Sequence, residues 1–196
     1  MRCVLCLLPL GLAALPALAC PTAEDLATGI RLTQADGSVE TFRRVSPAVV
    51  EQRTRYTDGY EALNLFGQGL HLMQLADLEE DGTISNILRF AYGVEAAEMP
   101  VPTAGGSWQV EVGVIEGFST SREVQSQSYG AATEVTIGDC TYDAIPVTID
   151  YLGDETDYSE EITYLPSLGF GYLTRWEEPG TAPDTYVHVK IEAVAP

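Results

Sequence analysis

Short runs of alternating apolar and polar residues are the feature that most restricts how this chain can fold. In the clearest run, from Ile145 to Tyr151, every second residue is Ile, Val or Tyr, with Pro, Thr and Asp between them. A period of two residues is typical of a half-buried β-strand. Similar runs begin at Ile162 and Phe170, so the region 137–176 is predicted to form consecutive strands at the centre of the fold.

About twelve such runs extend along the chain, with turn residues between them and no long amphipathic helix. The dipeptides at 36–37 and 58–59 are both Asp-Gly, which is typical of the tight turns of β-hairpins. This pattern predicts an all-β protein, either an antiparallel β-sandwich or an open, curved half-barrel. The spacing of the strands does not choose between the two.

Two segments depart from the alternating pattern. Thr22 to Thr28 predicts one short N-terminal helix, because Thr22 can cap it and Asp25 stands three residues further on, as in a capping box. Ser121 to Tyr129 is almost entirely polar. We therefore expect that strand at a sheet edge or on a solvated face.

The first nineteen residues have the features of a secretory signal peptide. Arg2 precedes an apolar run that ends in Ala17-Leu18-Ala19, which offers small residues where a signal peptidase cuts. The run is shorter than the roughly 20 residues that a bilayer core requires, and it contains prolines, so a membrane anchor is disfavoured. We expect residues 1–19 to be removed, leaving 20–196 as a single β-rich domain, periplasmic or secreted, with no transmembrane segment.

Cleavage after Ala19 would leave two cysteines, Cys20 and Cys140, in a compartment that permits oxidation. This predicts one disulfide. The alternative is lipidation of Cys20, the first mature residue, as in an outer-membrane lipoprotein. Lipoprotein signals usually have Leu where this chain has Ala17, so the sequence favours the disulfide.

The strong acidic excess excludes some partners. The chain has 29 acidic and 10 basic residues, a formal net charge of −19. Such a surface repels phosphate backbones and anionic lipid head groups. We therefore expect no nucleic-acid partner and no electrostatic docking on membranes.

Motifs for catalysis or cofactor binding are not evident in the sequence. The two histidines, His71 and His188, lie in separate predicted strands and do not have the short spacing of a metal site. No Gly-x-Ser-x-Gly nucleophile elbow occurs. The sequence thus predicts neither catalytic residues nor a cofactor.

One acidic turn resembles the beginning of an EF-hand calcium loop. Asp77, Glu79 and Asp81 would supply oxygen ligands at the first, third and fifth positions, and Gly82 follows at the sixth. The twelfth position, which should be a bidentate Glu, is Leu88. We therefore interpret 79–82 as a β-turn, and keep these three carboxylates only as weak metal candidates.

The segment Tyr164 to Gly171, with Tyr142 to Pro146 before it, resembles the C-terminal β-meander of uncharacterised exported bacterial proteins rich in β-structure. The resemblance covers residues 137–176. It implies an extracytoplasmic β-fold and no known activity.

These observations favour an exported, non-catalytic protein of the bacterial cell envelope. It would bind a partner protein or an apolar small molecule through one face of its sheet. Two alternatives remain open: a lipidated envelope protein that carries or senses lipid, and a hydrolase whose site is assembled only in three dimensions.

Overall fold

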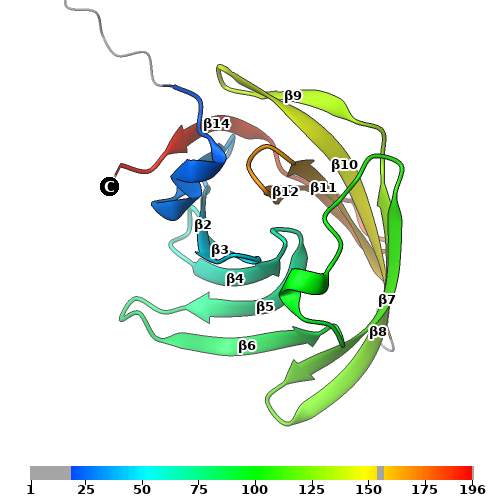
Figure 1. The fold of residues 1–196 in the computed structure, drawn as a ribbon. Coiled ribbons are helices and arrows are strands. Elements are labelled where there is room, and N and C mark those ends of the chain that lie inside the picture. The colour runs from blue at the N-terminus through cyan, green and yellow to red at the C-terminus, as the bar shows by residue number, and fades with distance from the viewer. Residues whose placement is uncertain (1–18, 154–156, 196) are drawn as a thin grey trace, which may run out of the picture.

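The computed structural model describes residues 19–153 and 157–195, and these form 14 antiparallel strands in one open sheet (Figure 1). The strands are β1 (Ile30–Gln34), β2 (Val39–Ser46), β3 (Val49–Arg55), β4 (Glu61–Gly67), β5 (His71–Leu78), β6 (Ile84–Ala91), β7 (Ser107–Glu116), β8 (Ser119–Tyr129), β9 (Thr133–Ile137), β10 (Cys140–Gly153), β11 (Tyr158–Leu165), β12 (Phe170–Glu177), β13 (Asp184–Thr185) and β14 (His188–Ala193). Two short 3-10 turns accompany them, η1 (Ala23–Ala27) and η2 (Ala96–Glu98). Within the described ranges, no helix has the length and apolar character needed to cross a membrane. Apart from Ala19, the predicted signal peptide lies outside the described residues.

The strands follow one another around the sheet as a meander. β1 to β8 pair in chain order, β10 to β13 continue from β8, and β14 returns to lie beside β1, while β9 pairs with β10. The sheet bends around a concave side, so that β3–β5 face β10–β12 (Figure 1). The predicted all-β class is confirmed, and of its two forms the structure has the open half-barrel.

Tight turns explain why neighbouring strands in the sequence pair in space. The N–H of Gly37 donates to the carbonyl of Gln34 at 3.0 Å, and the N–H of Gly59 donates to the carbonyl of Tyr56 at 3.1 Å. Both glycines have positive φ, which the Asp-Gly dipeptides supply at low steric cost. The two predicted hairpins, β1–β2 and β3–β4, are therefore confirmed.

One segment near the C-terminus is attached to both ends of the sheet. β13 pairs with β12, and the N–H of Tyr186 then donates to the carbonyl of Thr174 at 2.9 Å. One residue later the carbonyl of Val187 accepts from the N–H of Ala35 at 2.8 Å, and β14 continues along β1. The connection from β13 to β14 thus spans the gap between the two ends of the meander.

A disulfide fixes the segment before η1 to the start of β10. Cys20 is bonded to Cys140 at the start of β10, with Cα atoms 5.5 Å apart. The hydroxyl of Tyr142, two residues along β10, donates to the carbonyl of Pro21 at 3.0 Å. The predicted bridge is therefore present in the structure.

The predicted N-terminal helix forms only a 3-10 turn, η1. The N–H of Thr22 donates to a carboxylate oxygen of Asp25 at 2.7 Å, as the expected capping box requires. η1 buries Leu26 completely in the cluster that contains Phe42 and Phe170, whose rings stack with centroids 4.2 Å apart. Burial of that leucine contributes about 2 kcal/mol, so the turn is held by packing and not by helix length.

β8 lies inside the sheet, and the prediction of an edge or solvated strand at Ser121–Tyr129 was wrong. It pairs with β7 on one side and β10 on the other, and Glu123, Gln125, Gln127 and Tyr129 are buried. The Nε2 of Gln125 donates to Glu123 at 2.7 Å, and the hydroxyl of Tyr129 donates to Gln127 at 3.1 Å. Because these polar groups satisfy one another, they can be buried without losing their hydrogen bonds.

Candidate functional site

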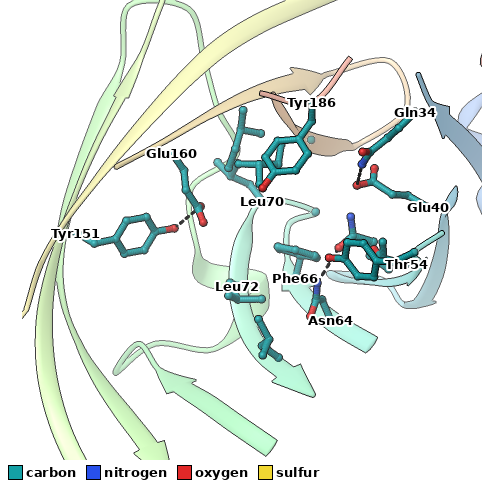
Figure 2. A pocket seen from close by; sticks show the side chains of 17 residues that line it. Gln34, Glu40, Thr54, Asn64, Phe66, Leu70, Leu72, Tyr151, Glu160 and Tyr186 are labelled. Atoms are coloured by element: carbon teal, nitrogen blue, oxygen red, sulfur yellow. Dashed lines mark hydrogen bonds between the residues drawn. The ribbon is translucent and has the colours of Figure 1, made fainter. Parts of the chain in front are cut away.

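The concave side of the sheet contains a cavity of about 190 Å³ (Figure 2). β1–β5 form one wall, β10–β12 form the other, and Tyr186 enters from the connection between β13 and β14. Of the lining residues, all within the described part of the chain, none is Lys or Arg. The cavity is therefore shaped by the curvature of the sheet, and its charged lining groups are acidic.

Apolar side chains from both walls line much of this cavity. They are Phe66 on β4, Leu72 and Leu75 on β5, Leu70 in the β4–β5 turn, Ile162 on β11 and Leu173 on β12. Leu70, Ile162 and Leu173 belong to the same apolar cluster, which also contains buried residues of β10. These residues can therefore pack against the apolar part of a bound molecule.

The turn between β4 and β5 requires glycine to hold Leu70 in this position. Gly69 has a φ of +68°, and a Cβ placed there would lie 2.2 Å from the carbonyl oxygen of Gly169. The N–H of Gly171 donates to the carbonyl of Gly69 at 2.9 Å. Only glycine allows this close approach of two backbone segments, which brings Leu70 between the two walls.

Several polar side chains line the part of the cavity formed by β1–β4. The Nε2 of Gln34 donates to Glu40 Oε1 at 3.1 Å, and Nε2 of His188 lies 3.1 Å from Glu40 Oε2. Nearby, the Nδ2 of Asn64 donates to Gln52 at 2.8 Å. The Oδ1 of Asn64 is buried and has no hydrogen-bond partner among the described residues.

Glu160 enters the cavity from the opposite wall, on β11 (Figure 2). The hydroxyl of Tyr151 donates to its Oε2 at 2.8 Å, and the ring of Tyr151 stacks on Tyr158 with centroids 4.2 Å apart. Burial raises the pKa of Glu160 to about 7, the Tyr151 bond opposes this, and the negative charge of Glu123 adds to it. At neutral pH this carboxyl group is therefore close to half protonated.

The chemistry of the lining favours binding of a molecule with hydrogen-bond donors. Glu160 is a carboxylate in the lining, and the apolar residues named above line both walls. Buried acceptors are costly when they are not bonded. A ligand that is apolar over most of its surface and carries one hydrogen-bond donor would match both the apolar walls and the carboxylate.

The structure places the three metal candidates, Asp77, Glu79 and Asp81, around the β5–β6 hairpin. Gly82 N–H donates to the carbonyl of Glu79 at 2.9 Å, which confirms the predicted β-turn. The Nδ2 of Asn86 donates to Asp77 at 2.6 Å. Among the described residues, no three His, Cys, Asp or Glu side chains gather closely enough to hold a metal ion.

The two histidines have different surroundings. His71 is fully buried, with Nε2 2.8 Å from the carbonyl oxygen of Pro100 and Nδ1 3.2 Å from Gln127 Nε2. His188 contacts Glu40 instead, and its Nδ1 has no hydrogen-bond partner within the described chain. Among the described residues, no Ser, Thr or Cys side chain is hydrogen-bonded to a ring nitrogen of either histidine.

Glu40 and Glu160 were not predicted as site residues. Each stands in phase with the buried face of its strand, Glu40 two residues before Phe42 and Glu160 two residues before Ile162. The signal that could have identified them is a carboxylate at a position where the alternating pattern of the strand otherwise places an apolar residue. Their meeting around one cavity depends on the curvature of the sheet, which no local pattern encodes.

No family model matches the chain, and no curated protein matches it in sequence. Among solved structures it resembles the crystal structure of the hypothetical lipoprotein YmcC from Escherichia coli K12, with 10% sequence identity and a TM-score of 0.44. The likeness covers 83% of this chain and 87% of that one.

Proposed function

We propose that this chain is an exported, non-catalytic protein of the bacterial cell envelope, periplasmic or secreted, that binds a small amphipathic ligand in the concave cavity. The observation that carries the proposal is the cavity itself. It combines apolar walls with a few polar groups, as small-molecule sites do. The disulfide supports export, because such bonds persist in oxidising compartments.

The size of the cavity restricts the ligand. Pockets for drug-sized molecules have volumes of about 300–1,000 Å³, and this one measures about 190 Å³. It therefore suits a smaller molecule, or one end of a longer one that leaves through the opening. A role in carrying a whole lipid has less support, and the Cys20 sulfur that would carry a lipid anchor is bonded to Cys140.

Hexanol is a suitable first probe, because it has a short apolar chain and one hydroxyl group. We expect it to bind with about millimolar affinity, within the limit that ligand size sets. Amide chemical shifts in a two-dimensional NMR spectrum should then move on β4, β5, β11 and β12. Shifts confined to the convex face, or none at all, would reject the cavity as the site.

Two matched variants locate the binding. Leu173→Phe adds volume inside the cavity, and Leu152→Phe makes the same change at a position on β10 that is 52% exposed. We expect the first to weaken hexanol binding at least about tenfold, because added volume in a packed space excludes the ligand. The second should leave binding unchanged. Circular dichroism would confirm that both variants fold.

A further inference from the structure

The two carboxylates of the cavity differ in how far the protein itself satisfies them. Glu40 is bonded at both oxygens, to Gln34 and to His188. Glu160 is bonded at Oε2 by Tyr151, and neither of its oxygens forms an ion pair with the described residues. Its Oε1 is therefore the carboxylate oxygen that remains available to a ligand in the cavity.

Among the described residues, the surroundings of Glu160 provide no positive charge. The titratable groups whose pKa values are coupled to that of Glu160 are all acidic or phenolic. They are Tyr92, Glu123, Tyr151, Tyr158 and Tyr186. Desolvating an unpaired carboxylate is costly, and an opposite charge or strong hydrogen bonds must offset it. The raised pKa of Glu160, about 7, shows that the protein alone does not offset this cost.

We propose that the ligand of this cavity carries a cationic nitrogen, such as a protonated amine, with Glu160 as its counter-ion and the apolar part of the ligand against Leu70, Ile162 and Leu173. This rests on the proposed binding function and adds the chemical class of the ligand. Two aromatic residues in the lining, Tyr56 and Tyr186, support it, because aromatic rings attract cations. The lack of Lys and Arg among the lining residues disfavours an anionic ligand.

Three probes of equal chain length test the head group: hexylamine, hexanol and hexanoate. At pH 8, Glu160 is mostly ionised and hexylamine is protonated. We expect hexylamine to bind roughly tenfold or more tightly than hexanol, since hydrogen bonds between charged partners are stronger than those between neutral partners. Hexanoate should bind more weakly than hexanol.

Two variants connect that preference to Glu160. In Glu160→Gln the tenfold preference for hexylamine over hexanol should disappear, because the counter-ion is removed. Glu161→Gln is the matched control, because Glu161 is the next residue of β11, pairs with Arg175 and has a side chain that is 55% exposed. It should keep the full preference.

The wild-type protein offers a second measurement that needs no variant. Pairing with a cation lowers the pKa of a carboxyl group, so hexylamine binding at pH 7 should release up to about half a proton from Glu160. Calorimetry in two buffers with different ionisation enthalpies measures that release. Hexanol should release none.

The outcomes separate the two proposals. If hexylamine and hexanol bind equally and neither releases a proton, the cationic ligand is overturned and the binding function stands. If Glu160→Gln retains the preference, Glu160 is not the counter-ion. If none of the three probes binds, the binding function fails, and the cationic ligand fails with it.

Discussion

Nε2 of His188 lies 3.1 Å from Oε2 of Glu40, a contact between residues 148 positions apart in the chain. His188 begins β14 and Glu40 lies on β2, with β1 between them in the sheet. The two side chains are 1% and 6% exposed. This contact therefore fixes the last strand to the N-terminal hairpin from the concave side.

His188→Ala should lower the free energy of unfolding by about 2–3 kcal/mol, measured by urea denaturation. The change removes the donor to a buried Glu40 oxygen and the ring that packs edge-on against Tyr172, with centroids 4.5 Å apart. Lys190→Ala on the same strand is the control, because Lys190 is 55% exposed and its pair with Glu192 is worth little. Equal stability of the two variants would show that the His188–Glu40 contact does not hold β14.

His71 should make the protein less stable in acid. Burial lowers its pKa to about 4, and its contact with the Pro100 carbonyl opposes this only partly. In the unfolded chain the pKa is about 6.5. Between these values the unfolded state binds more protons, so the contribution of His71 to stability is lost as pH falls from about 6.5 to about 4, on the order of 3 kcal/mol in total.

The test of this prediction is the difference in unfolding free energy between wild type and His71→Phe across pH 4–7. We expect the unfolding free energy of the variant to rise relative to that of the wild type as the pH falls, because the variant has no buried imidazole to protonate. His188 is not the control here, since it contacts a carboxylate. A difference that stays constant across this range would contradict a buried neutral His71.

Local sequence signals predicted the features that depend on neighbouring residues. The turns at 36–37 and 79–82 each need only a positive φ at the glycine and one hydrogen bond between residues three positions apart. The Asp-Gly dipeptide in each turn specifies both. The Cys20–Cys140 bond was predicted differently, by counting the cysteines that would remain after export. It required no knowledge of the path of the chain between them.

The unpredicted features depend on long-range geometry. β8 was expected at an edge because its polar composition suggested solvent, but Gln125 accepts a hydrogen bond from Tyr92 at 3.1 Å, 33 positions away. Such a partner is not visible in a local pattern. Glu160 likewise became a candidate site residue only when the curvature of the sheet placed it opposite Glu40 and β1–β5.

Calcium should not bind at the β5–β6 hairpin more tightly than millimolar. The hydroxyl of Tyr60 and the amide of Asn86 donate to the two carboxylate oxygens of Asp77, and the hydroxyl of Ser85 donates to Glu79. An ion would have to replace these bonds without the bidentate Glu that calcium loops provide. The melting temperature in micromolar calcium should therefore equal that in a chelator, and a calcium-dependent rise would contradict this.

Reduction of the Cys20–Cys140 bond should lower the melting temperature by roughly 10 °C. The bond closes a loop with a sequence separation of 120 residues, and loop entropy then gives about 4–5 kcal/mol. For a domain of this size each kcal/mol corresponds to about 2–4 °C. Scanning calorimetry with and without reductant measures the shift, and Cys20→Ser with Cys140→Ser should reproduce it.

The mass of the intact protein from its own host provides an independent check of this bond. The unreduced protein should gain the mass of two hydrogen atoms on reduction. Both thiols should react with an alkylating reagent only after that step. A diacylglycerol on Cys20, or alkylation of denatured protein without reductant, would show that the bridge is absent.

Glu160 should give stability the opposite pH dependence to His71. Its pKa is raised to about 7 in the folded protein, chiefly by burial, from an ordinary value of 4.5. Between these values the folded state binds more protons than the unfolded state, so stability falls as pH rises from about 4.5 to about 7. The total change is on the order of 3 kcal/mol.

Because the two slopes overlap and oppose each other, the contributions of His71 and Glu160 to the wild-type profile should nearly cancel between pH 4.5 and 6.5, and single variants should expose each component. Glu160→Gln removes the buried acid but keeps a group that can bond to the Tyr151 hydroxyl. Relative to wild type it should gain stability steadily as pH rises through this window and reach its full advantage above pH 7. Glu161→Gln, on the exposed side of the same strand, should show no such trend. If Glu160→Gln and Glu161→Gln run parallel from pH 4.5 to 8, then Glu160 is solvated in the folded protein and its carboxylate is not held in the cavity in the way that the structure shows.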